Sequence, residues 1–161
     1  MSQPLLYSVE REFPVRVSTL WSAWTKAEEL ENWYHPTNFA AVKGATVSAL
    51  YLGGIWACGV DVQPHNFVAF FYGKYIKIEE FTVIEHTMHY TESKLDFDAK
   101  DLTTPSHLVV INFEDRGENS WVKFSQFGDL PAGEEKRAQA GMESYLDSLA
   151  LYLKGGQTPG E

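Results

Sequence analysis

The chain has 161 residues, of which 44% are hydrophobic and 14% are aromatic, a composition that suits one globular domain with a substantial core. Its 13 Lys and Arg residues against 22 Asp and Glu residues give a formal net charge of −9. Because surfaces that bind nucleic acid are basic, this acidic balance argues against a nucleic-acid partner.

The cysteine content and the N-terminal sequence indicate the cellular compartment in which we expect the protein. Cys58 is the single cysteine, so no intrachain disulfide can form, which is typical of a reducing environment. The first residues, Met1-Ser2-Gln3-Pro4, lack the charged and apolar regions of a secretory signal. No apolar run reaches the roughly 18 residues of a membrane span. We therefore expect a cytoplasmic protein that does not insert into membranes.

The hydrophobic pattern predicts a chain of strands with a short helical insertion near the start and a long helix at the end. In chain order, the expected elements are a strand over 5–14, short helices over 19–26 and 27–33, strands over 41–50, 55–62, 67–79 and 81–91, a polar loop over 92–104, strands over 107–114 and 120–127, and a helix over 134–153. Ser18 is expected to cap the first helix, and Pro36 to end the second.

The last helix has the most regular pattern. Its apolar residues form one stripe of a 3.6-residue period: Ala138, Met142, Tyr145, Leu146, Leu149, Tyr152 and Leu153. Glu134 and Glu135 stand in the first turn, where the helix dipole favours negative charge, and Lys154-Gly155 mark the end. A 20-residue helix is about 30 Å long. We therefore expect an α+β fold with helices on one face of a curved antiparallel sheet of about seven strands.

Alternation along the strands predicts which side chains face this helix. The expected inward residues are Trp56, Phe70, Tyr72, Ile84, His86, Met88, Val109, Ile111, Val122, Phe124 and Gln126. Tyr72, His86 and Gln126, with Tyr145 of the helix, are polar groups among apolar ones. Such groups orient a ligand in an apolar pocket, but they would also be satisfied by one another or by water in a filled core. The sequence leaves both alternatives open.

Patterns for metal binding and catalysis are weak. His86 and His89 are three residues apart on one strand, which places them on opposite faces and argues against a shared ion. The acidic residues of the polar loop lack the glycine and closing glutamate of a calcium loop. The sequence has no nucleophile elbow, phosphate loop or dinucleotide pattern. We therefore expect no cofactor, no metal and no catalytic residue that can be assigned.

Five stretches form a signature through their order and spacing. They are Arg11-Glu12-Phe13 with Leu20-Trp21-Ser22-Ala23-Trp24, the Leu-x-x-Trp-x-x-Pro-x-x-Phe pattern from Leu30 to Phe39, Gly53-Gly54-Ile55-Trp56, Gly73-Lys74-Tyr75-Ile76-Lys77-Ile78, and Gly141-Met142-Glu143-Ser144-Tyr145-Leu146-Asp147-Ser148-Leu149. Together they resemble the activator-of-Hsp90-ATPase-like branch of the START-like (SRPBCC) superfamily. The helix-grip fold of that superfamily is shared with the major birch pollen allergen and with polyketide cyclases.

The resemblance implies a single helix-grip domain, which we expect over 1–155, and the Gly and Pro content of residues 156–161 predicts a disordered tail. It also implies a deep cavity between the sheet and the last helix that holds a hydrophobic or amphipathic small molecule, with His35 at the rim. It does not imply catalysis. The candidate ligand-binding residues are Trp33, Phe39, Trp56, Phe70, Tyr72, His86, Met88, Gln126, Met142, Tyr145 and Leu149.

Three functions are compatible with these features. The first is a cytoplasmic binding protein for a hydrophobic or aromatic small molecule. The second is a cyclase or dehydratase in which Tyr72, His86 or Tyr145 moves a proton on a polyketide-like substrate. The third is a chaperone-interacting module. The Hsp90 activator carries a second domain that a chain of this length cannot include, so we do not expect the full co-chaperone role. Homodimerisation is left open by the sequence.

Overall fold

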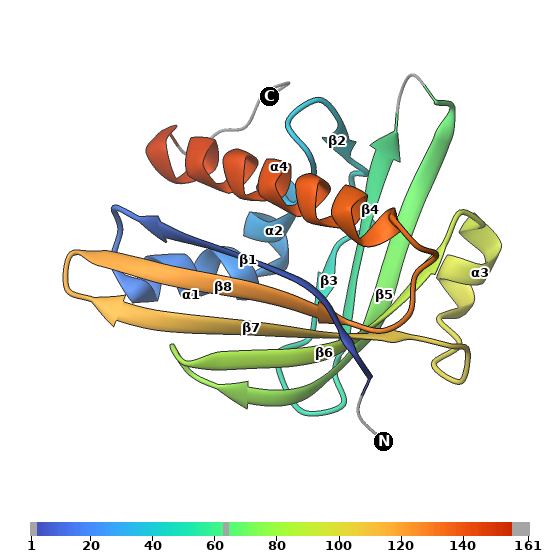
Figure 1. Ribbon diagram of the computed structural model, residues 1–161, viewed down its shortest axis with the longest axis horizontal. Helices are drawn as coiled ribbons and strands as arrows, with labels where there is room; N and C mark the ends of the chain where they lie inside the picture. The colour runs from blue at the N-terminus through green and yellow to red at the C-terminus, as the bar shows by residue number, and fades with distance from the viewer. Residues whose placement is uncertain (1–2, 63–64, 156–161) are drawn as a thin grey trace.

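A strongly curled antiparallel sheet grips one long helix (Figure 1). The computed structural model describes residues 3–62 and 65–155. The strands are β1 (Leu5–Phe13), β2 (Ala40–Ala41), β3 (Val47–Ser48), β4 (Ile55–Val62), β5 (Phe67–Glu79), β6 (Val83–Thr91), β7 (His107–Arg116) and β8 (Asn119–Phe127). The helices are α1 (Val17–Thr25), α2 (Ala27–Trp33), α3 (Lys94–Ala99) and α4 (Glu134–Gly155). The strand order is β1-β8-β7-β6-β5-β4-β2, and β3 also pairs with β4.

The expected α+β helix-grip fold is confirmed, and most element boundaries agree within two residues. Two elements differ. The strand expected over 41–50 is divided into β2 and β3, which Gly44 separates with a φ of 83°, a backbone conformation that favours glycine. The loop expected over 92–104 contains α3, whose first turn is capped by the Ser93 side chain. Ser18 lies inside α1 rather than at its N-cap, because that helix begins at Val17. The tail over 156–161 lies outside the described residues.

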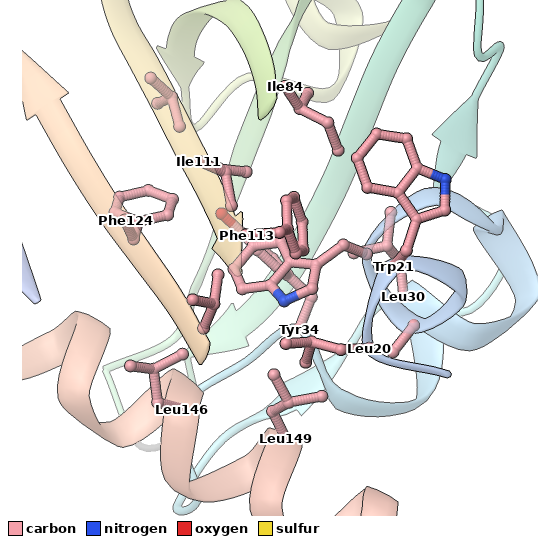
Figure 2. Packing of buried hydrophobic residues seen from close by; sticks show 14 of the residues in the cluster. Leu20, Trp21, Leu30, Tyr34, Ile84, Ile111, Phe113, Phe124, Leu146 and Leu149 are labelled. Carbon is pink, nitrogen blue, oxygen red and sulfur yellow. The ribbon is translucent and has the colours of Figure 1, made fainter. Parts of the chain in front are cut away.

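The second half of α4 is the part that is tightly seated. Leu146 and Leu149 are fully buried, and Figure 2 shows both pointing from α4 into the cluster, Leu149 on the side of Leu20 and Leu146 on the side of Phe124. The Ser148 hydroxyl donates to the His35 carbonyl at 2.7 Å. One turn earlier, the Ser144 hydroxyl accepts from the backbone N–H of Thr37 at 2.9 Å. These bonds fix α4 to the segment that follows α2.

An aromatic core fills the space beside this half of α4. The ring centroids of Trp24 and Trp33 lie 4.7 Å apart, and Trp24 also stacks with Phe124 at 6.2 Å. The indole N–H of Trp33 donates to the Ala23 carbonyl at 2.8 Å, so this fully buried ring leaves no polar atom unpaired. Much of the aromatic content of the sequence is therefore used to build a solid core at one end of the molecule.

The convex face of the sheet is covered at β5, and one orientation prediction is wrong as a result. Phe70 stacks on Phe97 of α3 with centroids 4.4 Å apart, and the Tyr72 hydroxyl donates to the Asp101 carbonyl at 3.0 Å. Both side chains therefore lie on the outer face, and Phe71 and Tyr75 belong to the inner core. Since β5 is buried on both faces, its sequence is apolar on both, and alternation cannot select the inner one.

Gly73 explains part of the sequence signature. A Cβ at this position would lie 1.9 Å from the carbonyl oxygen of Thr87 on β6, so any side chain would force the two strands apart. The pairing of β5 with β6 shifts register between Tyr75 and Lys77. The close approach at Gly73 and this shift together sharpen the bend of the sheet, and the bend creates the concave face on which α4 lies.

Candidate ligand-binding site

A cavity of about 590 Å³ lies between the concave face of the sheet and the first half of α4. Its volume is in the range of small-molecule sites. It is lined by Tyr7 of β1, Phe71 of β5, Met88 and Tyr90 of β6, His107 of β7, Phe124 and Gln126 of β8, Ala138, Gly141, Met142 and Tyr145 of α4, and the connecting residues Gln3, Tyr34, Pro105, Ser106, Asp129 and Leu130. The solid core and the hollow thus occupy opposite ends of α4.

Four of the candidate residues line this cavity. Met88 and Gln126 enter it from the sheet, and Met142 and Tyr145 enter it from α4. The two helical residues are three apart, which places them on the same face of the helix. Tyr145 also packs edge-to-face on Tyr34, with ring centroids 4.8 Å apart.

The other candidates lie elsewhere. Leu149 and Trp33 are fully buried in the solid core, and Phe39 packs with Val60, Val62 and Ala69 near the short β2 strand. Phe70 and Tyr72 are on the outer face, as described above. Sequence alternation had no means of separating these positions from the lining, because filled core and cavity wall have the same apolar pattern.

Trp56 and His86 form a stacked pair away from the cavity, with ring centroids 4.1 Å apart. They border a closed gap without room for a water molecule, which Trp24 and Tyr34 also border. Nδ1 of His86 lies 2.8 Å from the carbonyl oxygen of Thr87. A carbonyl oxygen can only accept, so Nδ1 carries the proton and donates it. Within the described chain, His86 Nε2 and Trp24 Nε1 are buried without a partner.

His35 is not at the rim. It is 2% exposed, its ring Nδ1 lies 2.7 Å from the carbonyl oxygen of Pro36, and its own carbonyl accepts from Ser148. His35 therefore links the segment after α2 to α4 and is buried beside the core.

A chain of hydrogen bonds crosses the sheet side of the cavity. The Tyr7 hydroxyl donates to Oε1 of Gln126 at 2.7 Å, and Nε2 of the same amide lies 2.8 Å from Nδ1 of His107. The second ring nitrogen of His107 lies 3.1 Å from the Asp129 carbonyl oxygen. With this amide orientation, Gln126 donates to Nδ1 and His107 donates from Nε2, so a neutral imidazole completes the chain. Burial also raises the pKa of Tyr7 above its ordinary range.

Tyr34 and Tyr145 differ from Tyr7 in having no such partner. In the part of the chain that the structure describes, neither hydroxyl makes a hydrogen bond to a protein group. Burial, followed by the proximity of Cys58, raises the pKa of both phenols well above the ordinary value. Both therefore stay protonated, and their O–H groups are available as donors.

Several lining residues were missed, although a signal for them exists. Tyr7 has the same parity as Val9 and Phe13 in β1, and His107 has the same parity as Val109 in β7. Residues two apart on a strand share a face, so strict parity would have placed both on the concave side. Tyr34 follows α2 in an irregular segment, where no periodicity applies.

No cluster of three His, Cys, Asp or Glu residues that could hold a metal ion occurs within residues 3–62 and 65–155. Among the helices described, none is long and apolar enough to cross a membrane.

Comparisons with solved structures show the same fold. The structure is similar to that of the AHSA1 protein from Silicibacter pomeroyi, with a TM-score of 0.75, 17% identity, and coverage of 92% of this chain and 96% of that chain. It is also similar to a protein from Chromobacterium violaceum, with a TM-score of 0.74, 15% identity, and coverage of 90% and 94%. DynU16, from the dynemicin biosynthetic locus, gives a TM-score of 0.67 at 16% identity and covers 94% of this chain and 48% of that one.

Comparisons of the sequence identify the family. A search of the curated proteins finds no match. The family described as activator of Hsp90 ATPase homolog 1-like protein matches residues 14–154, which include α1, α2 and every strand and helix that follows them. The chain belongs to the activator of Hsp90 ATPase homolog 1-like family.

Proposed function

We propose that the protein is a cytoplasmic carrier or sensor that binds a hydrophobic or amphipathic small molecule between the sheet and α4. The observation that carries this proposal is the cavity of about 590 Å³, which is open and unfilled by side chains. Its walls combine aromatic and aliphatic side chains with a few converging polar groups, which is the usual composition of a small-molecule site.

The same geometry favours binding over proton transfer. Of the three residues considered for acid–base chemistry, Tyr72 lies on the outer face and His86 lies outside the cavity lining. Tyr145 alone lines the cavity, and burial holds it in its protonated form. The imidazole that does line the cavity, His107, has both ring nitrogens engaged by protein groups. A general base needs a free lone pair within reach of the substrate, which the engaged imidazole of His107 does not offer.

The proposal is tested by titrating the protein with Nile red, an uncharged dye that fluoresces in apolar sites. We expect saturable binding with one dye per chain. Gly141 offers a way to fill the cavity, because no atom lies within 4 Å of a Cβ built there and the residue lines the space. Gly141→Leu should weaken dye binding by at least about tenfold, since overpacking a site costs about 1–3 kcal/mol.

Ala140→Leu is the matched control, because Ala140 is the preceding residue of the same helix and is exposed. This variant should bind the dye as the wild type does. Native mass spectrometry of the freshly purified protein is an independent test, because it detects any small molecule that stays bound during purification. If the wild type shows no saturable dye binding and retains no molecule, or if the two leucine variants bind equally well, the cavity is not a ligand site.

A further inference from the structure

The charges around the cavity restrict the ligand. Among the described lining residues there is no Lys or Arg, and Asp129 is the one carboxylate. A second carboxylate stands next to the lining, since Glu92 accepts from the Tyr90 hydroxyl at 2.6 Å. An anionic ligand would therefore lose its hydration in an apolar space without a cation to pair with.

The polar groups on the sheet side are already used within the protein. The bonds from Tyr7 to Gln126, from Gln126 to His107 and from His107 to the Asp129 carbonyl form one continuous chain. A ligand that recruited these groups would have to break bonds that the folded chain already makes, so little net affinity would result.

The helix side offers two free donors. Tyr34 is buried, and it packs edge-to-face on Tyr145 with ring centroids 4.8 Å apart. Both residues line the cavity, and their hydroxyl groups make no hydrogen bond within the described chain. A hydroxyl that no protein group binds can donate to a ligand oxygen without breaking a bond of the folded chain.

We propose that the cavity selects uncharged ligands that carry a hydrogen-bond-accepting oxygen, such as an aromatic ketone, and that the hydroxyls of Tyr34 and Tyr145 bind this oxygen. The inference rests on the ligand-binding function proposed above. The lining also contains the rings of Phe71 and Phe124 from the sheet, against which a flat ring system of the ligand would pack. Carboxylates with the same ring system are bound more weakly.

Three matched probes test this proposal by displacing Nile red: acetylnaphthalene, ethylnaphthalene and naphthoate, substituted at the same ring position. They share one ring system and differ in the group presented to the tyrosines, which is a ketone, a hydrocarbon or a carboxylate. In the wild type, the ketone should bind at least about tenfold more tightly than the carboxylate, because the charge of the carboxylate stays unpaired.

Tyr34→Phe and Tyr145→Phe remove one donor each and keep the ring. Each should weaken ketone binding roughly three- to tenfold, which is the usual effect of a lost hydrogen bond, and should leave the affinity for the hydrocarbon unchanged. Tyr152→Phe is the control, since this tyrosine is on the same helix, lies outside the cavity lining and donates to Glu29. Thermal unfolding of each variant verifies that it is folded.

The outcomes separate this inference from the general function. If dye and probes bind but the carboxylate equals the ketone, or if the two variants lower the affinity for ketone and hydrocarbon alike, the cavity binds ligands without the selectivity inferred here. If neither the dye nor any probe binds to the folded wild type, the binding function is refuted, and the inference falls with it.

Discussion

The imidazole of His86 lies face to face with Trp56 and has lost all contact with water. Its Nδ1–H bonds to the Thr87 carbonyl, and no described residue pairs with its Nε2. Burial lowers the pKa of His86 from 6.5 to about 4, because a charged ring would be desolvated there without a counter-ion. The folded protein therefore holds this histidine in its neutral form at physiological pH.

This setting predicts a pH dependence of stability. Between pH 6.5 and pH 4, the unfolded chain binds a proton at His86 that the folded chain does not, so stability falls as the pH is lowered through this window. The difference between a pKa of 6.5 in the unfolded chain and a pKa of about 4 in the folded one corresponds to about 3 kcal/mol. The free energy of unfolding in urea should therefore fall by about 3 kcal/mol more for the wild type than for His86→Phe between pH 7 and pH 4.

The phenylalanine variant keeps an aromatic ring against Trp56, so the stacked contact is retained. His89, whose pKa burial also lowers, is present in both proteins, and its contribution cancels in the comparison. Parallel pH profiles for the two proteins would show that His86 does not carry the dependence.

Single residues also show what a sequence pattern can and cannot specify. Alternation assigns Met88 and Gln126 to the concave side, where the structure has them, because β6 and β8 have clear differences between their faces. It fails at Phe70 and Tyr72, since α3 buries the outer face of β5 as well. The contact of α3 with β5 is a tertiary contact between separate segments, so the periodicity of either segment alone cannot predict it.

At the scale of an element, α4 has two unlike halves. Three of its four buried residues, Leu146, Ser148 and Leu149, belong to the second half, and Met142 lies shortly before the midpoint. The first half lies over the cavity, and the bonds to the segment after α2 are made only at the end of this half, by Ser144, and in the second half, by Ser148. Since burial and tertiary bonds stabilise helices more than intrinsic propensity does, the first half should open more readily.

Hydrogen exchange followed by mass spectrometry tests this asymmetry. We expect amides over 136–141 to exchange at least about ten times faster than those over 147–153, because local opening there costs less free energy. Saturation with Nile red should slow exchange in the first segment and leave the second unchanged. Uniform protection along the helix, with no response to the dye, would contradict the uneven seating of α4.

The periodic pattern of α4 predicts the helix, but it does not predict which part of the helix covers the cavity and which part packs on the core. The apolar stripe from Ala138 to Leu153 predicts the helix and its buried face. It does not reveal that Ala138 and Met142 face a hollow and that Leu146 and Leu149 face packed side chains. That difference depends on how much space the side chains of β1, β6 and β8 leave unfilled beneath α4. The spacing of apolar residues along one helix gives no information about this space.

At the scale of the whole molecule, a solid aromatic core and an open cavity share one sheet and one helix. The core under α1 and α2 supplies the burial that keeps the chain folded, and this allows the other end to remain hollow. A void of this size lacks the contacts that fill an ordinary interior. Ligand binding should therefore stabilise the whole domain, because α4 and the sheet contribute to both regions.

The size of this effect can be predicted. At a free Nile red concentration one hundred times the dissociation constant, binding adds about 2.7 kcal/mol to stability. For a domain of this length, each kcal/mol shifts the unfolding midpoint by roughly 2–4 °C, so differential scanning calorimetry should show a rise of roughly 5–10 °C. At the same dye concentration, a tenfold weaker Gly141→Leu variant gains only about 1.4 kcal/mol, so its midpoint should rise about half as much as that of the wild type. A midpoint that the dye leaves unmoved in the wild type would contradict coupling between the cavity and the fold.

The open space around Gly141 has a consequence for divergence within the family. A methyl group at this position would meet no atom within 4 Å, so side chains of increasing size could be accommodated there without moving the backbone. Each would reduce the volume of the hollow by a different amount while the core at the far end of α4 stayed intact. One helical position could thus alter which molecules fit, and related chains could acquire different cargoes through single substitutions that leave folding untouched.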